Sequence, residues 1–240
     1  MIQGKAAVVT GGSRGIGRAI VERLRRDGAE VVFGYANNEA AAREVEKLTG
    51  AVGLRADLSD PAQTEQLMAA AEERLGGLDV LVNNAAASFA PASIAETELA
   101  DFDRVLTVNA RSAFLTIRHA ARTMREGGRI VNVSTVNTVR PSVKIAPYAA
   151  SKGALEQLTA VAAKELGARG ITVNTVSPGF TDTDLLRGLN PAEVLEAAAA
   201  LSPLGRLGQP ADVADVVAFL VGPDGRWMTG QNLRASGGVG

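Results

Sequence analysis

The sequence predicts an α/β fold with one doubly wound parallel sheet of about seven strands and helices on both faces. Short runs of Val, Ile and Leu alternate along the chain with longer amphipathic segments. Strands buried on both faces of a parallel sheet read as continuous apolar runs, and the connections between them must be helical crossovers. The alternation therefore predicts a sheet covered on both sides. No shift of composition, linker or repeat divides the chain, so we expect a single domain over residues 1–240.

The expected elements follow one another in a regular order. Strands are predicted at residues 6–10, 31–35, 51–57, 78–84, 128–134, 170–179 and 231–235. Helices are predicted at residues 16–26, 39–48 and 61–75, in a long region that ends near 125, at 148–168 and around 212–220. Residues 180–209 break this rhythm with Pro191, Pro203 and a run of alanines. A long segment after the carboxyl end of a strand usually covers a ligand in such folds, so we expect a lid at about 180–209.

The composition excludes several classes of protein. The 240 residues include no Cys and one His, so we expect no disulfide, no metal site and no Ser-His-Asp triad, and we assign His119 a structural role. With 25 basic and 26 acidic residues, the chain lacks the basic excess of a nucleic-acid-binding protein. No apolar run reaches the ~18 residues of a membrane span, and the N-terminal segment lacks the features of a signal peptide. We expect a cytoplasmic protein without a nucleic-acid or membrane partner.

A glycine-rich turn lies between the first expected strand and the first expected helix. It reads Thr10-Gly11-Gly12-Ser13-Arg14-Gly15-Ile16-Gly17. Glycines in these positions allow a tight turn, a close approach to a pyrophosphate and close packing of the helix on the strand. The N-terminus of the helix adds free N–H groups and a partial positive charge. The turn therefore predicts a phosphate site, with a merely tight strand–helix connection as the alternative.

The T-G-x3-G-x-G spacing of this turn resembles the cofactor motif of the short-chain dehydrogenase/reductase family. Further motifs of that family follow in order, namely Asn83-Asn84-Ala85, Tyr148 with Lys152, and Pro178-Gly179 with Thr183. The resemblance runs from Lys5 to about Gly238, and it implies a Rossmann fold that binds a nicotinamide cofactor. The family motif N-N-A-G has Gly where this chain has Ala86. A left-handed backbone is harder for Ala, so we expect the loop beside the nicotinamide to differ slightly.

The residues after the second expected strand favour NADP(H) over NAD(H). An acidic residue there would hold the ribose 2′-hydroxyl of NAD, but Ala36, Asn37 and Asn38 follow the strand, and Glu39 opens the next helix. In the family, a basic residue at the position of Arg14 accompanies a 2′-phosphate, which Arg can bind through two charge-assisted hydrogen bonds. The alternative for Arg14 is a solvated loop charge.

The resemblance also assigns the remaining contacts with the cofactor. Asp57 matches the family residue that contacts the adenine amino group, with a plain helix cap as the alternative. The full set of expected cofactor-binding residues is Thr10, Gly11, Ser13, Arg14, Gly15, Ile16, Gly17, Tyr35, Asn37, Asp57, Leu58, Asn84, Ala85, Tyr148, Lys152, Pro178, Gly179 and Thr183.

Tyr148 and Lys152 are the expected catalytic pair. They are four positions apart at the start of an expected helix and therefore share one helical face. An ammonium beside a phenol favours the phenolate and lowers its pKa, so the Tyr can exchange a proton with a carbonyl or an alcohol near neutral pH. The pattern alone often arises by chance. Here it follows the fifth expected strand, and its small intervening residues are typical of the family.

The resemblance implies two further catalytic residues. The family has a hydroxyl thirteen positions before the Tyr, and counting back from Tyr148 gives Thr135, which we expect to hold the substrate oxygen. Ser134 is one position off and should point to the opposite face of the strand, so it is the second choice, to be preferred only if a bulge intervenes. Asn109 matches a family Asn that helps to bind a water linking the Lys to solvent. The alternative for Asn109 is a buried amide satisfied by the backbone.

The reaction that the resemblance implies is hydride transfer between a nicotinamide and a carbonyl carbon or secondary alcohol. The cofactor performs the redox step, and the protein orients the partners. Tyr148 would donate the proton, Thr135 would hold the oxygen, and Lys152 would bind the ribose hydroxyls.

The substrate class is less constrained by the sequence. The pattern R-G-I-T-V-N, which starts at Arg169, resembles bacterial 3-oxoacyl-[acyl-carrier-protein] reductases of fatty-acid or polyketide synthesis. Two basic positions dock the acidic carrier protein in such enzymes, and Arg169 fits one of them. The other position holds Glu126, beside Arg125, and a like charge there opposes an acidic partner. The expected lid is apolar, with Phe180, Leu185, Leu186, Leu189 and Leu195.

We therefore expect a small or medium apolar substrate, with the carrier-protein reductase as the alternative. A non-catalytic NADP(H) sensor and an α/β methyltransferase are only minor alternatives. The presence of both Tyr148 and Lys152 argues against each of them.

We also expect a homo-oligomer, most simply a tetramer. Family members pair through the helices expected at 101–125 and 148–168. These two segments carry many small residues, namely Ala110, Ala113, Ala120, Ala121, Ala154, Ala160, Ala162 and Ala163.

Overall fold

A computed structural model of the protein describes residues 2–240, except for the side chain of Leu189. Within these residues, seven strands form one sheet in the order β3-β2-β1-β4-β5-β6-β7, and all neighbours pair in parallel. The strands are β1 (Ala6–Val9), β2 (Glu30–Tyr35), β3 (Val52–Arg55), β4 (Val80–Asn83), β5 (Arg129–Val133), β6 (Thr172–Pro178) and β7 (Asn232–Ala235). The predicted doubly wound parallel sheet is confirmed.

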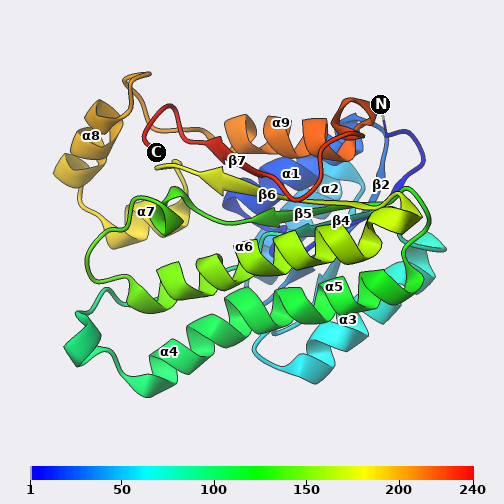
Figure 1. The fold of residues 1–240 in the computed structure, drawn as a ribbon, viewed down its shortest axis with the longest axis horizontal. Coiled ribbons are helices and arrows are strands. Elements are labelled where there is room, and N and C mark those ends of the chain that lie inside the picture. Colours follow the sequence, from blue (N-terminus) through cyan, green and yellow to red (C-terminus); the bar gives the residue numbers. More distant parts are fainter. Residues whose placement is uncertain (1) are drawn as a thin grey trace.

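Helices cover both faces of the sheet (Figure 1). One face carries α1 (Gly15–Arg26), α2 (Glu39–Thr49) and α9 (Pro210–Val221). The helices on the side of the other face are α3 (Pro61–Leu75), α4 (Leu99–Leu106), α5 (Ser112–Thr123) and α6 (Ala146–Leu166). The short helices α7 (Asp184–Leu189) and α8 (Ala192–Leu201) lie outside these two layers, beyond the end of β6.

The side chains of alternate strand residues pack into two separate hydrophobic cores, one on each face of the sheet. In β2, Val31 and Phe33 pack with α1 and α9, whereas Val32 packs on the opposite side with α3 and α5. In β4, Val82 likewise packs on the face of α1 and α9, and Leu81 packs on the face of α3 and α5. This two-sided burial is why the strands read as unbroken apolar runs rather than as alternating patterns.

Local signals in the sequence begin and end several helices. The side chain of Asn38 accepts a hydrogen bond from the Ala41 N–H and so caps α2. Asp60 caps α3 in the same way, and Gly76 ends that helix in the left-handed conformation. Asp60, rather than Asp57, is therefore the cap at this point of the chain.

The connection between β4 and α5 differs from the prediction. The expected long helical region begins only at Leu99, because residues 84–98 form a loop with a single 3-10 turn, η1 (Ile94–Glu96). Between α4 and α5 the chain makes a π-helical turn, η2 (Thr107–Arg111). Such turns are frequent at functional sites, and this one contains the buried Asn109.

The strand order reverses between β1 and β4, so the chain leaves these two strands in opposite directions along the sheet. A crevice forms at such a point outside the carboxyl ends of the strands, and ligands bind there in open α/β sheets. The expected lid, residues 180–209, lies at this edge, and a parallel bridge between Thr181 and Gly208 joins its two ends. Within residues 2–240 no helix is long and apolar enough to span a membrane.

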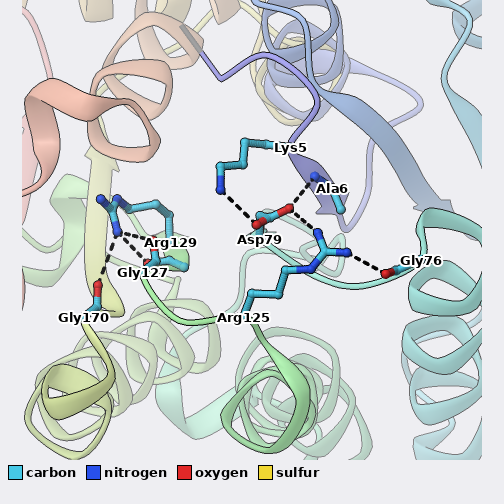
Figure 2. A network of polar contacts seen from close by, with 9 residues as sticks. Lys5, Ala6, Gly76, Asp79, Arg125, Gly127, Arg129 and Gly170 are labelled. Atoms are coloured by element: carbon cyan, nitrogen blue, oxygen red, sulfur yellow. Dashed lines mark hydrogen bonds and ion pairs between the residues drawn. The ribbon is translucent and has the colours of Figure 1, made fainter.

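The opposite, amino edge of the sheet is held by a charged cluster (Figure 2). The buried Asp79 accepts hydrogen bonds from Lys5 Nζ at 3.1 Å, from the Ala6 N–H at 2.9 Å and from Arg125 Nη1 at 2.8 Å. Burial alone would raise the pKa of Asp79, but the bond from Ala6 and the two cations hold that pKa below its ordinary value. The cluster ties together the starts of β1 and β4 and the end of α5.

Candidate active site

A cleft of about 970 Å³ lies at the carboxyl edge of the sheet. This volume is in the range of cofactor and small-molecule sites. Its walls include most of the residues predicted from the sequence, namely Gly11, Ser13, Arg14, Gly15, Ile16, Gly17, Tyr35, Asn37, Asp57, Leu58, Asn84, Ala85, Ser134, Thr135, Tyr148, Lys152, Pro178, Gly179 and Thr183. Thr10 and Asn109 are not part of the lining, and both support it from behind.

Thr10 connects the ends of β1 and β4 instead of facing the cleft. Its hydroxyl accepts hydrogen bonds from the N–H groups of Asn84 and Ala85 at 3.0 and 3.1 Å. The side chain of Asn84 in turn donates to the carbonyls of Thr10 and Gly11. The predicted direct contact of Thr10 with a cofactor stays a prediction, and in the structure this side chain fixes the loop that lines the cleft.

The glycine-rich turn forms a cradle that side chains would fill. Gly11 has a φ of 68°, and a Cβ there would lie 2.9 Å from the Cα of Ala85. At Gly17, a Cβ would lie 2.1 Å from the Gly11 carbonyl oxygen. Only glycine fits at these two positions, and α1 begins inside the turn, so its free N–H groups lie at the cleft.

Arg14 lies on the cleft wall beside the segment that follows β2. Among the described residues, its guanidinium has no hydrogen-bond or carboxylate partner. Arg18, one turn further along α1, is by contrast paired with Glu22 and Glu44. The segment opposite Arg14 is Tyr35 to Asn38, which has no acidic side chain, and Glu39 pairs with Arg43 on α2. The arrangement suits an anionic group between α1 and this segment.

Asp57 is exposed at the cleft edge. One of its carboxylate oxygens accepts a hydrogen bond from the Ser59 N–H at 2.9 Å. Leu58 lies beside it and is 8% exposed. These two residues form the outer wall of the cleft beyond β3.

Tyr148 and Lys152 come together in the first turns of α6. Lys152 is 2% exposed, and its Nζ donates to the Val133 carbonyl at 2.7 Å and lies 5.9 Å from the centre of the Tyr148 ring. Burial lowers the pKa of Lys152 to about 8, although the charge of Glu156 acts in the opposite direction. Burial raises the pKa of Tyr148, and the adjacent Thr135 hydroxyl partly offsets that rise.

The two candidate hydroxyls at the end of β5 have different surroundings. Ser134 Oγ donates to Glu156 Oε1 at 2.6 Å. Thr135 lies beside the phenol of Tyr148, and its Oγ1 accepts a weak hydrogen bond from the Asn137 N–H at 3.3 Å, which caps the 3-10 turn η3 (Val136–Thr138). The geometry favours Thr135 for a substrate oxygen, because the Ser134 proton is already donated to a carboxylate.

Asn109 lies behind the catalytic pair. Its Oδ1 accepts from the Ala87 N–H at 2.8 Å, and its Nδ2 donates to Ser151 Oγ at 2.9 Å. Ser151 in turn donates to the carbonyl of Tyr148 at 2.7 Å. Asn109 thus joins the loop after β4 to the turn of α6 that carries Tyr148 and Lys152.

The loops on the substrate side of the cleft contain one residue in the left-handed backbone conformation that is not glycine. Ala86 does not adopt a left-handed backbone, and among residues 2–240 the one non-glycine residue with positive φ is Lys144, at 66°. Such a conformation costs ~1–3 kcal/mol and requires support from its surroundings. The Lys144 carbonyl accepts a hydrogen bond from the Ala92 N–H at 3.1 Å, which joins the loop after β4 to the loop before α6.

Beyond β6, Thr183 lines the cleft and also caps α7, since its hydroxyl accepts from the Leu186 N–H at 3.2 Å. Phe180, Leu185 and Leu186 from the lid line the cleft, whereas Leu195 is one of the buried residues of α8. The side chain of Leu189 is outside the described part.

Sequence reasoning missed two residues of the site. The ring of Phe89 stacks on that of Tyr148, with centres 5.1 Å apart and planes 20° apart. Nothing in the sequence indicates this contact, because Phe89 lies in the loop that we expected to be helical. Glu156 had a usable signal, since it follows Lys152 by one helical turn on the same face.

The fold and the cleft define a dinucleotide-binding oxidoreductase. The family model described as enoyl-(acyl carrier protein) reductase matches residues 11–240. An uncharacterized oxidoreductase of Methylorubrum extorquens is 43% identical over 99% of this chain and 98% of its own. Versicolorin reductase 1 of Aspergillus parasiticus is 41% identical over 99% of this chain and 97% of its own.

A solved structure of a related enzyme is also similar to this chain. A short-chain dehydrogenase from Burkholderia cenocepacia, determined in complex with NADP, is 42% identical, with a TM-score of 0.92 over 99% of this chain and 98% of that one. The chain belongs to the short-chain dehydrogenase/reductase family and is an oxidoreductase.

Proposed function

We propose that the protein is an NADP(H)-dependent reductase of small or medium apolar ketones. The observation that carries this proposal is the joint placement of Tyr148, Thr135 and Lys152 in the same cleft as the glycine-rich turn with Arg14. The NADP complex of the Burkholderia relative and the name of versicolorin reductase 1 support the cofactor and the reductive direction.

The residues present fit a dinucleotide. The cradle at Gly11 and Gly17 leaves space that a Cβ would fill, so a pyrophosphate can approach the N–H groups of α1. Arg14, without a carboxylate partner, would hold the 2′-phosphate by charge-assisted hydrogen bonds. Lys152 uses one N–H on the Val133 carbonyl and keeps two for ribose hydroxyls. When bound, NADPH supplies the hydride.

The chain's own residues orient the carbonyl and move the proton. The Thr135 O–H donates to the carbonyl oxygen and holds it beside the phenol of Tyr148. Tyr148 gives its proton to that oxygen as negative charge develops there. The ammonium of Lys152 stabilises the phenolate that remains. Asn109 keeps this part of α6 aligned with the loop after β4.

The apolar lid supports an apolar substrate. Phe180, Leu185 and Leu186 face the cleft together with Phe89 and Val143. Within residues 2–240 no group of three or more His, Asp and Glu side chains could hold a metal ion.

The carrier-protein alternative is weakened by the surroundings of Arg169. Its Nε donates to Glu126 Oε1 at 2.8 Å, and its two other nitrogens donate to the carbonyls of Ala121 and Met124 at the end of α5. This guanidinium caps a helix and is paired with a carboxylate, so it has little left to offer an acidic partner.

We further propose that the protein forms a homo-oligomer through α5 and α6. The stripe of alanines does not support this as expected, because Ala120, Ala162 and Ala163 are buried in the chain's own core and Ala113 is buried as well. The large exposed apolar side chains on these helices are instead Phe114 and Val161, at 46% and 53% exposure. Light scattering at micromolar concentration tests the proposal, and a mass of a single chain would reject it.

The function itself is tested by following NADPH oxidation with two kinds of substrate, a panel of apolar ketones and a short 3-oxoacyl thioester, with NADH as the control cofactor. We expect turnover of ketones with NADPH. Fast turnover of the thioester alone would replace the proposal with the 3-oxoacyl reductase. No turnover of either, despite NADPH binding, would favour a sensor.

A further inference from the structure

Lys152 carries a positive charge in a buried position. Its Nζ has one protein partner, the neutral carbonyl of Val133. A buried charge is costly unless an opposite charge compensates it. Among the described residues, the charged group whose field raises the pKa of Lys152 is Glu156, one turn further along α6.

Glu156 is bound by Ser134 rather than by Lys152. The Ser134 hydroxyl donates to Glu156 Oε1 at 2.6 Å, and the Ser134 backbone is fixed in the sheet, since its N–H donates to the Val176 carbonyl at 2.8 Å. Lys152 is bound to the carbonyl of Val133, the preceding residue. Two consecutive residues at the end of β5 therefore tether the ammonium and the carboxylate separately, and the two groups form no contact ion pair.

Several other charged side chains near α6 have partners elsewhere. Arg104 pairs with Asp101, Arg118 with Glu65, His119 with Glu72 and Arg169 with Glu126, and Arg111 donates to the Ser59 carbonyl. On the side of the cleft, the titratable group facing Lys152 is Tyr148. β6, which also packs on α6, carries no charged residue.

We propose that Glu156 is a positioning residue whose carboxylate, held by Ser134, keeps Lys152 charged and so fixes the alkaline limit of the reaction. The separation matters because a contact ion pair would occupy N–H donors that Lys152 needs for ribose hydroxyls. At a distance, the carboxylate stabilises the charge and leaves those donors free. The inference deepens the proposed function and rests on it for the role of Lys152.

The direct test is the titration of Lys152 in the free protein. The chain has five lysines, so labelling with ε-¹³C lysine gives a simple NMR spectrum, and Lys152→Arg identifies the signal that belongs to position 152. Glu156→Gln removes the charge and retains an oxygen that accepts from Ser134. We expect the Lys152 midpoint to fall by about one pH unit or more, a tenfold change in its protonation constant. Glu165→Gln, on an exposed part of the same helix, should leave it unchanged.

Ser134→Ala should shift the titration midpoint of Lys152 in the opposite direction. The released carboxylate can swing toward the ammonium, so we expect the Lys152 midpoint to rise and the KM for NADPH to increase severalfold. An unchanged midpoint in this variant overturns the tether. An unchanged midpoint in Glu156→Gln, even with reduced thermal stability, overturns the whole inference and leaves Glu156 a structural residue.

A second readout links the titration to catalysis. Lys152 is charged below its midpoint, so the alkaline limb of ketone reduction should move down in Glu156→Gln by the same amount as the NMR midpoint. If the NMR midpoint of Lys152 moves but the alkaline limb of the pH–rate profile does not, the charge of Lys152 has no role in the reaction. Because the NMR titration needs no substrate, failure of the proposed function would leave it interpretable.

Discussion

Replacement of Thr135 by Ala tests which hydroxyl at the end of β5 serves the reaction. Thr135 lies beside the phenol of Tyr148, and its oxygen accepts from the Asn137 N–H, so its hydroxyl proton is not donated to a carboxylate. The Ser134 proton is donated to Glu156 instead. Thr135→Ala and Ser134→Ala therefore form a matched pair of variants, each of which removes one hydroxyl from adjacent positions.

The magnitude follows from what each deletion removes. Loss of one donor to an oxygen that gains negative charge lowers kcat by about 10²–10³, or ~3–4 kcal/mol of transition-state stabilisation. The bond from the Asn137 N–H is long, at 3.3 Å, so its loss should cost under ~1 kcal/mol of folding free energy. We expect Thr135→Ala to lose kcat while NADPH affinity and Tm stay near those of the wild type.

The assay is steady-state NADPH oxidation near neutral pH, with NADPH affinity measured separately by fluorescence titration. Thr135→Ser keeps the hydroxyl and should retain activity within about tenfold. Ser134→Ala should lose less than Thr135→Ala, because near neutral pH Lys152 stays charged in this variant. The reverse ranking would refute the assignment, and an equal loss of NADPH affinity in Thr135→Ala would show that the hydroxyl serves the cofactor.

The remaining predictions concern the proton donor, the cofactor and the amino edge. Tyr148→Phe should abolish turnover and retain NADPH binding, and residual activity above a hundredth of the wild type would contradict a role in proton transfer, which contributes ~10²–10⁴-fold. Arg14→Ala should weaken NADPH binding by ~10-fold or more and leave NADH binding unchanged, since the charge-assisted bonds to the 2′-phosphate contribute about 1.5–3 kcal/mol, and equal losses would refute that contact. Asp79→Asn should lower the free energy of unfolding by ~1–3 kcal/mol, less than for a fully buried ion pair because Lys5 and Arg125 are about half exposed. The pKa of Asp79 is depressed in the fold, so its contribution is complete above the ordinary Asp pKa of ~4 and is lost as pH falls through the folded value; a stability difference that persists in acid would contradict the ion pairs as its source.

The sheet could be predicted because its strands carry their own signal. Residues such as Val31, Val32 and Phe33 are apolar whichever face they meet, so the run marks a strand buried on both sides. The spacing of Tyr148 and Lys152 was equally informative, since a helix fixes which residues share a face. These features depend on local geometry alone.

Other features depend on contacts between distant segments and leave no local trace. The stack of Phe89 on Tyr148 joins a loop to a helix across the cleft. Ala113 and Ala120 looked suited to a helix–helix interface between copies, but the same small side chains let α5 approach the chain's own sheet. Small residues permit close packing without specifying the partner, so the sequence could not separate the two uses.

The placement of rigid and variable parts explains where substrate choice must lie. The amino edge is tied by Asp79 with its two cations, and the catalytic pair is anchored on β5 and α6. The proposed substrate wall is formed instead by the lid and by the loops after β4 and before α6, and the bond from the Ala92 N–H to the carbonyl of the strained Lys144 joins these two loops. Phe89, from the loop after β4, covers one face of the Tyr148 ring. Changes in the loops can therefore alter the substrate without disturbing the proton donor or the cofactor cradle.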